Sequence, residues 1–315
     1  ILVHELGHFL AAKAMGIRVD EFGLGFPPRI WGKKMGETVY TINWIPFGGF
    51  VRIFGESPDA ESIEGPDSDR SFVNKAKWKQ SIVLVAGVAF NMIFAWLLIV
   101  VGFMSGMPTP VDYAEGRTVT DPKLTVSFVT PESPADEAGL QSGDVITGLT
   151  ANGATLSEMT PEAVVSFITD HPHEELTLAY LRGEEGAGTV NVTPASGVLP
   201  DKRAIGISMD MIGILELGPV GAVVEGTKTT VSLTGAVVVG LYDFFAQAFQ
   251  GEANLNQVSG PVGIVGLVGD ASTLGLIYLL SFTAVISIHL AVINLIPFPA
   301  LDGGHVMFLF FEMVS

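Results

Sequence analysis

Two histidines and a glutamate near the start of the sequence have the spacing of a metal-dependent hydrolase. His4 and His8 are four residues apart, so a helix places both side chains on one face, with Glu5 beside them. Two imidazoles suit Zn²⁺, and a carboxylate next to the metal can act as the general base of a hydrolysis. The rest of residues 1–12 is apolar, and polar side chains in such a segment are costly unless they have a function. The alternative, a pair of hydrogen-bonded core histidines, is therefore less favoured than a metal site.

A single carboxylate stands out in a second apolar stretch, near the end of the sequence. Asp302 is the only aspartate or glutamate between Ala271 and Phe311, and two prolines and two glycines surround it. Prolines break a helix, and glycines let unwound backbone approach another group closely. Two histidines and one carboxylate form a common zinc ligand set, so we predict Asp302 as the third ligand. The alternative is an aspartate that caps a helix just outside the lipid.

The elements that must position these residues are membrane helices. Hydrophobic residues make up 48% of the chain and charged residues only 16%. Residues 81–104 and 274–299 each lack a formal charge and are long enough to cross a hydrocarbon core of about 30 Å. Residues 231–249 form either a third span or an interfacial, partly re-entrant helix. Residues 1–16 and 305–315 are expected to be parts of two further spans, which gives about four transmembrane helices, the first and last incomplete.

Charge distribution predicts the orientation of the loops. Nine of the 16 Lys and Arg lie between Arg18 and Lys79, whereas residues 105–222 hold five of them and 17 acidic residues. Because basic residues concentrate in short cytoplasmic loops, residues 17–80 are predicted to be cytoplasmic and 105–222 extracytoplasmic. The net charge of −17 argues against a nucleic-acid partner. The absence of cysteine excludes disulfides and thiolate ligands.

The segment between the spans has the pattern of a small α/β domain. Strands are expected at 124–130, 175–182 and 188–194, and a helix from Pro161 to Ile168 with Thr160 as its cap. The string SPADEAGLQSGDVI at 133–146 resembles that of a bacterial PDZ domain, a fold that binds extended peptides at a sheet edge. The strand lining its groove is expected at 204–208, which includes Ile205, Gly206 and Ile207. A β-rich spacer without a ligand is the alternative.

Several motifs together resemble the site-2 protease family. They are HELGH at 4–8, Asn91 within AGVAFN, SGPVGI at 259–264 and NLIPFPALDGG at 294–304. The position of the PDZ-like insert is similar to that in the bacterial branch that includes the regulator of sigma-E protease. The resemblance implies an intramembrane protease with one Zn²⁺ held by His4, His8 and Asp302, with Glu5 as the base. It also makes Asn91 and Asn294 candidates for holding the substrate backbone or an oxyanion.

One segment of the predicted cytoplasmic loop is a candidate for substrate binding. Residues 38–54 are expected to form two strands around a turn at 46–49, and this segment resembles the membrane-associated β-hairpin of the same family. Its exposed edge, at Gly49, Phe50, Val51 and Arg52, could pair with an unwound substrate. An ordinary surface hairpin is the alternative. In one respect the sequence departs from the family: His289 stands where an asparagine is more common, and a packed, neutral histidine is expected there.

We therefore expect a polytopic α-helical membrane protein with one inserted α/β PDZ-like domain and a cytoplasmic-side β-hairpin. The expected segments are 1–16 (first span), 17–80 (cytoplasmic loop), 81–104 (second span), 105–122 (linker), 123–210 (PDZ-like domain), 211–273 (amphipathic or re-entrant helical region), 274–299 (third span), 300–304 (LDGG loop) and 305–315 (start of the fourth span). The predicted location is the inner or plasma membrane.

Three classes of function fit these observations. The favoured one is a zinc metalloendopeptidase that cuts single-span membrane proteins, such as anti-sigma factors or signal-peptide remnants. An inactive membrane-bound PDZ scaffold or receptor is the main alternative, and the intact HELGH and LDGG motifs argue against it. A metal transporter would be expected to show internal repeats, which the sequence lacks. In the protease, the PDZ-like domain would either exclude bulky ectodomains or bind a peptide or a newly made C-terminus.

Overall fold

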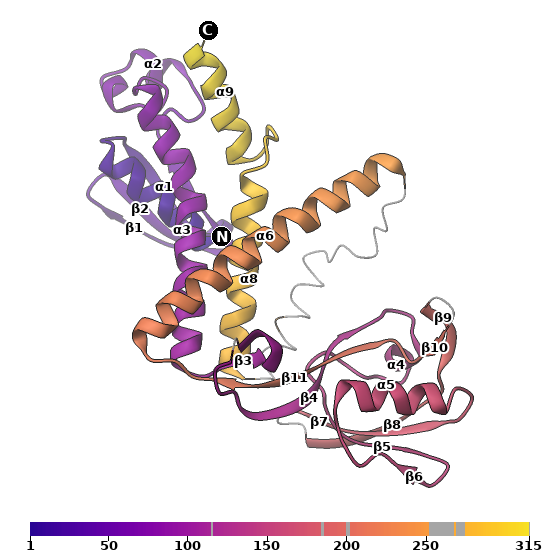
Figure 1. The fold of residues 1–315 in the computed structure, drawn as a ribbon. Coiled ribbons are helices and arrows are strands. Elements are labelled where there is room, and N and C mark those ends of the chain that lie inside the picture. The colour runs from indigo at the N-terminus through magenta and orange to yellow at the C-terminus, as the bar shows by residue number, and fades with distance from the viewer. Residues whose placement is uncertain (115, 184–185, 200–201, 252–267, 269–274, 315) are drawn as a thin grey trace. The chain divides into compact units, whose positions relative to one another are not determined.

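The computed structural model describes residues 1–315 except 115, 184–185, 200–201, 252–267, 269–274 and 315 (Figure 1). The chain divides into two compact units, described separately below. The first unit comprises Ile1–Ile99, Gly226–Ala253 and Thr283–Ser315, and the second comprises Val100–Glu225 and Asn254–Phe282. The motif at 259–264 lies outside the described residues.

Three of the described helices are long and apolar enough to cross a membrane. They are α3 (Lys77–Met104), α6 (Pro219–Gln250) and α8 (Leu276–Asn294). The predicted second span at 81–104 thus lies within α3. Residues 231–249, for which two interpretations were open, lie within the 32-residue helix α6. Residues 211–215 of the expected helical region instead belong to a strand.

The core of the first unit forms where α1 (Leu2–Ala14) meets its neighbours. Apolar side chains of α1, α3, the strands described below and α9 (Asp302–Val314) pack into one buried cluster, which includes Phe9, Val83 and Leu309. Gly7 allows α1 and α3 to approach closely, because a Cβ atom at this position would lie 2.5 Å from the Ala86 carbonyl oxygen. An ion pair between Lys77 and Glu312 links the start of α3 to the last turns of α9.

The connection between α8 and α9 differs from the prediction at both ends. The third span was expected to reach residue 299, but α8 ends at Asn294, because the two prolines that follow cannot donate the helical hydrogen bonds. The 300–304 segment was expected to be a loop, but α9 begins at Asp302, so both glycines belong to its first turn. A Cβ atom on Gly303 would lie 2.6 Å from the Ile296 carbonyl oxygen, and one on Gly304 would lie 2.6 Å from the Phe298 carbonyl carbon. The glycines therefore let the connecting loop pack against the start of α9.

The first unit also contains a sheet formed by two long, bent strands, β1 (Val19–Met35) and β2 (Thr38–Ile53). The prediction that residues 38–54 form a hairpin by themselves is wrong, because both halves of β2 pair with β1. Residues 19–24 of β1 pair with 49–53 of β2 and also with 39–42, and residues 29–35 pair with 38–43. The strand β1 was missed because its glycines and its Pro27-Pro28 pair weaken the local strand signal.

Glu37, in the turn between β1 and β2, joins three elements of the first unit. Lys13 at the end of α1 donates to its carboxylate with an N–O distance of 2.6 Å, and Arg70 pairs with it at 2.7 Å. The hydrogen bond from Lys13 lowers the pKa of Glu37; partial burial opposes this effect, and Arg70 adds to it. The charged carboxylate therefore stabilises the folded state.

Replacing Glu37 with glutamine should destabilise the protein at neutral pH, and the effect should disappear in acid. Because the pKa is lowered on folding, the contribution of the carboxylate is present above its unfolded pKa of about 4.3 and is lost as the pH falls through the folded pKa. The side chain is about one-third exposed, so we expect a loss of only about 0.5–1 kcal/mol. Thermal unfolding in detergent, followed by circular dichroism, should show a lower Tm for the variant near neutral pH and a much smaller difference below about pH 3.5. Glu64→Gln is the control, since Glu64 makes no ion pair within the part of the chain that the structure describes; an equal effect in both variants would contradict the argument.

The second unit is built on a seven-stranded sheet with the order β3-β11-β4-β5-β7-β8, in which β6 pairs with β5. Its elements are β3 (Met107–Pro110), the 3₁₀ helix η2 (Val111–Ala114), β4 (Thr120–Val129), α4 (Pro134–Glu137), β5 (Val145–Ala151), β6 (Ala154–Thr155), α5 (Pro161–Asp170), β7 (Leu176–Arg182), β8 (Gly186–Val192) and β11 (Ile207–Leu215). A separate pair of strands, β9 (Ala195–Leu199) and β10 (Lys202–Ala204), precedes β11. The cap of α5 is confirmed, because the Thr160 hydroxyl accepts from the Ala163 N–H at 3.3 Å.

Two boundaries predicted for this unit are wrong. The 105–122 linker contains β3 and η2, and β4 already begins at its end. The expected groove strand at 204–208 is interrupted, because Ile205 and Gly206 connect β10 to β11 and only Ile207 and Ser208 belong to the seven-stranded sheet. Gly206 has a φ of +87°, and its carbonyl oxygen accepts from the Thr130 N–H. This turn, which requires glycine, explains the break.

Candidate active site

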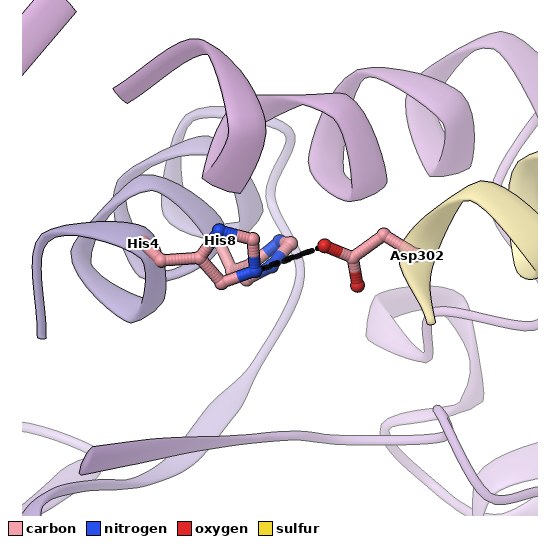
Figure 2. A group of neighbouring side chains, drawn as sticks. All are labelled: His4, His8 and Asp302. Atoms are coloured by element: carbon pink, nitrogen blue, oxygen red, sulfur yellow. Dashed lines mark hydrogen bonds and ion pairs between the residues drawn. The ribbon is translucent and has the colours of Figure 1, made fainter. Parts of the chain in front are cut away.

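The three predicted ligands meet in the first unit. His4 and His8 project from one face of α1 toward Asp302 at the start of α9 (Figure 2). The Nε2 atom of His4 lies 2.9 Å from Asp302 Oδ2 and 3.0 Å from His8 Nε2, and the latter lies 3.4 Å from the same carboxylate oxygen. Both histidines are buried, at 7% and 6% exposure. Within the described ranges, no other group of three histidine or acidic side chains is arranged to hold a metal ion.

The geometry of this cluster fits a divalent metal ion. In a tetrahedral zinc site with bonds of about 2.0–2.1 Å, neighbouring ligand atoms are about 3.3 Å apart. The three atoms here are separated by 2.9 to 3.4 Å. In addition, Asp302 Oδ2 is buried and makes no hydrogen bond. Buried oxygen atoms without a partner are rare and costly, and a bound cation would satisfy this one.

Glu5 contacts the neighbouring strand β2 instead of the ligands. Its Oε2 atom accepts a hydrogen bond from the Val51 N–H at 3.1 Å. That N–H therefore points away from β1, toward the free edge of β2. Because main-chain groups alternate in direction along a strand, those of Gly49 share this edge, whereas those of Phe50 and Arg52 face β1. The general-base candidate thus lies at a sheet edge that has no strand partner on this side among the described residues.

Helix α3 supplies the surroundings of both imidazoles. Val83 accepts a hydrogen bond through its carbonyl oxygen from His8 Nδ1 at 2.8 Å, and the Asn91 side-chain amide lies 3.4 Å from His4 Nδ1. Between them is Gly87, where a Cβ atom would lie 2.7 Å from His4 Cε1 and closer still to His8 Nε2. Gly87 was not predicted from the sequence. Its position four residues before Asn91, in the small-residue run AGVA, is the signal that could have identified it.

A cavity of about 290 Å³ opens onto the cluster. Its lining includes the three ligands, Glu5, Val51, Asn91 and Asn294, the last residue of α8. A second carboxylate that the sequence analysis did not single out, Glu56, also lines it. Neighbouring protein atoms raise the pKa of Glu56 even though the residue is exposed to solvent, and the nearby imidazoles of His8 and His305 oppose the shift. The cavity therefore brings together the predicted metal ligands, the candidate base and two side-chain amides.

Two further histidines lie elsewhere. The Nδ1 atom of His289 bonds the Val285 carbonyl oxygen at 2.9 Å, and its side chain lines an apolar cavity between α6 and α8. His305 lines a small adjacent cavity with Glu56 and Glu312. Neither borders the cavity at the three ligands. The predicted groove residues Ile205 to Ile207 belong to the other unit.

Comparison with known proteins identifies the family. The sequence pattern described as Peptidase family M50 matches residues 1–315. The chain belongs to this peptidase family. It is similar to the regulator of sigma-W protease RasP of Bacillus subtilis, with 28% identity over 100% of this chain and 87% of the relative. It is also similar to the zinc metalloprotease RasP of Geobacillus kaustophilus, with 29% identity over 100% and 87%. The protein all3971 of Nostoc sp., a zinc metalloprotease by name, is 36% identical over 99% of this chain and 83% of its own length.

The M50 chain is thus a zinc metalloprotease with several helices able to span a membrane. Family membership agrees with the resemblance seen in the motifs. It also gives the cluster of His4, His8 and Asp302 a chemical context, because a zinc metalloprotease needs a set of side chains that can hold the metal.

Proposed function

We propose that this M50 protease holds one Zn²⁺ through His4, His8 and Asp302 and cleaves the transmembrane segments of single-span membrane proteins. The observation that carries the proposal is the meeting of these ligands with the Glu5 carboxylate in one cavity. The walls of this cavity come from α1, from β2 and from the apolar helices α3 and α8. A hydrolytic site within such helices is suited to substrates that are themselves in the bilayer.

The chain's own residues divide the chemistry between them. Zinc bound at this site supplies a Lewis acid that polarises the scissile carbonyl and activates water. Glu5 takes a proton from the attacking water and passes it to the leaving amine. Asn294, at the end of α8, is a candidate to hold the substrate backbone or the developing oxyanion through its amide.

Substrate recognition is proposed to use the free edge of β2. A helical substrate hides its carbonyl groups in hydrogen bonds, so it must unwind before cleavage. An unwound segment can pair with Gly49 and Val51, whose main-chain groups face the cavity side, but not with Phe50 and Arg52, whose groups face β1. Such pairing would take the Val51 N–H from Glu5 and bring the substrate backbone beside the base.

The remaining assignments rest on the sequence pattern. Residues 17–80 are proposed to face the cytoplasm, since nine of the 16 basic residues lie between Arg18 and Lys79. The second unit is proposed to contain a PDZ-like domain outside the cytoplasm, acting as a size filter or as a binder of a peptide C-terminus. The name of the Bacillus subtilis relative supports a substrate connected with sigma-factor regulation, such as an anti-sigma factor.

The full chain in liposomes with a single-span reporter that lacks an ectodomain tests the proposal. We expect cleavage inside the hydrophobic segment, located by mass spectrometry, which stops on chelation and returns when Zn²⁺ is added back. Zinc binding with several reporters left intact would support an inactive scaffold instead. In the same vesicles, a substrate that never crosslinks to photoreactive residues at positions 49 and 51 would rule out pairing at the β2 edge.

A further inference from the structure

Three residues of α3 form a stripe along the two histidines of α1. Val83, Gly87 and Asn91 are spaced by four, so they share one face of the helix. His4 and His8 have the same spacing on α1, and the two sets meet in pairs: His8 with Val83, and His4 with Asn91. Gly87 lies between the pairs and leaves room for both rings. None of the three stripe residues is itself a predicted ligand.

The first pair fixes the orientation of His8. Its Nδ1 atom lies 2.8 Å from the Val83 carbonyl oxygen, which can only accept, so Nδ1 carries the hydrogen. In a neutral imidazole, the other nitrogen then keeps its lone pair. This nitrogen, Nε2, faces His4 and Asp302. The backbone of α3 thereby prepares His8 to bind a cation, because a backbone carbonyl is a usual partner for the second nitrogen of a ligating histidine.

The second pair must work in the same way if His4 is to bind the same ion. Asn91 Nδ2 lies 3.4 Å from His4 Nδ1, but an N–H pointing at this ring nitrogen would put the hydrogen on Nε2. Nε2 is the atom that faces Asp302 at 2.9 Å. Rotation of the amide by half a turn exchanges its oxygen and nitrogen without changing its shape. With the oxygen toward the ring, Nδ1–H donates to Asn91 and Nε2 is free for the metal.

We propose that Asn91 is a positioning residue for the metal: its side-chain oxygen accepts from His4 Nδ1 and turns Nε2 toward the ion. Together with the Val83 carbonyl, it makes α3 the element that orients both imidazoles. This inference rests on the proposed zinc site and assigns Asn91 a role different from binding the substrate or an oxyanion.

Burial and a third helix support this assignment. Asn91 is only 1% exposed, although its side chain borders the cavity, and its amide is already directed at the ring of His4. The hydroxyl of Ser287 on α8 donates to the Asn91 main-chain carbonyl oxygen at 3.0 Å, and Ser287 is itself buried. This bond fixes the position of Asn91 between α1 and α8. A group that had to reach a substrate would need more freedom and exposure.

Zinc affinity in three variants of Asn91 provides the test. The full chain is purified in detergent, and Zn²⁺ binding is measured without substrate by competition with a chromophoric chelator. Asn91→Leu and Asn91→Ala remove the acceptor and should weaken zinc binding by about 10–100-fold. Asn91→Asp retains an acceptor oxygen and should bind zinc about ten times or more as tightly as Asn91→Leu, because carboxylates are common partners of zinc-bound histidines. The absorption bands of the Co²⁺-loaded protein should shift in Asn91→Leu and Asn91→Ala, and in Asn91→Asp they should match those of the unmodified protein.

Other roles for Asn91 predict different results. An oxyanion role predicts unchanged zinc affinity in all three variants, with only kcat reduced. A purely structural role predicts that the buried charge of Asn91→Asp is the most harmful change and that the apolar Asn91→Leu is the mildest; either pattern would overturn the inference. Asn294→Leu is the matched control, since this second asparagine of the cavity makes no hydrogen bond to a predicted metal ligand among the described residues, and its replacement should leave zinc affinity unchanged. If the unmodified chain itself binds no zinc, the proposed function fails, which is distinct from failure of this inference.

Discussion

Replacing Glu5 with glutamine is expected to abolish peptide hydrolysis while leaving the metal bound. The substitution does not alter His4, His8 or Asp302, and the glutamine oxygen can still accept from the Val51 N–H. The amide cannot take a proton from water, so the variant lacks the general base. Loss of such a group lowers turnover by about 10²–10⁴-fold. We therefore expect zinc content equal to that of the unmodified protein, with cleavage of a single-span reporter close to background.

The second carboxylate of the cavity provides the control. Glu56→Gln also removes a negative charge from the cavity lining, but Glu56 is not joined to β2 by a bond like that of Glu5. Its effect on turnover should stay below about tenfold. Metal analysis and reporter cleavage on the same preparations separate the outcomes. If Glu5→Gln continues to cleave and Glu56→Gln does not, the roles of the two carboxylates must be exchanged.

The candidate site could be predicted from sequence where its geometry is local. His4 and His8 are one helical turn apart, so the helix alone determines that they share a face. Asp302 could be identified without knowing which residues it contacts, because an isolated carboxylate in an apolar segment is costly unless it has a function. The structure brings these three side chains together. What spacing could not predict is that Asp302 belongs to the first turn of α9, which depends on the close packing of the loop against Gly303 and Gly304.

The sheet of the first unit was predicted less well, for a physical reason. Strand pairing is a non-local property, and residues 38–54 contain enough strand-forming residues to suggest a hairpin of their own. The actual partner of both halves is β1, whose glycines and prolines give a poor local signal. The consequence reaches the site, because pairing with β1 determines which main-chain groups of β2 face Glu5. The strand register, and not the residue types, determines that the main-chain groups of Val51 face Glu5 whereas those of Phe50 face β1.

Gly87→Ala is the change expected to do the greatest damage to the site with the least change in composition. The added Cβ atom would lie 2.7 Å from His4 Cε1 and 2.8 Å from His4 Nδ1, and closer to His8 Nε2, so at least one imidazole must move. Both rings are buried and hydrogen-bonded to α3, which leaves little space for adjustment. Alanine is otherwise favourable within a helix by about 0.5–1 kcal/mol relative to glycine, so α3 itself should form.

We expect Gly87→Ala to lose zinc affinity and cleavage together, in contrast to Glu5→Gln, which should lose only cleavage. A displacement of about 1 Å at a catalytic group can cost roughly 10²-fold in rate, and weakened metal binding adds to this loss. Gly235→Ala in α6 is the matched control, because a Cβ atom there meets nothing within 4 Å. Chelator competition, reporter cleavage and circular dichroism should be measured on both variants. A folded Gly87→Ala protein that binds zinc as tightly as Gly235→Ala would mean that α3 does not restrict the two histidines, because only a ring free to move could accept the added methyl group without loss of the metal.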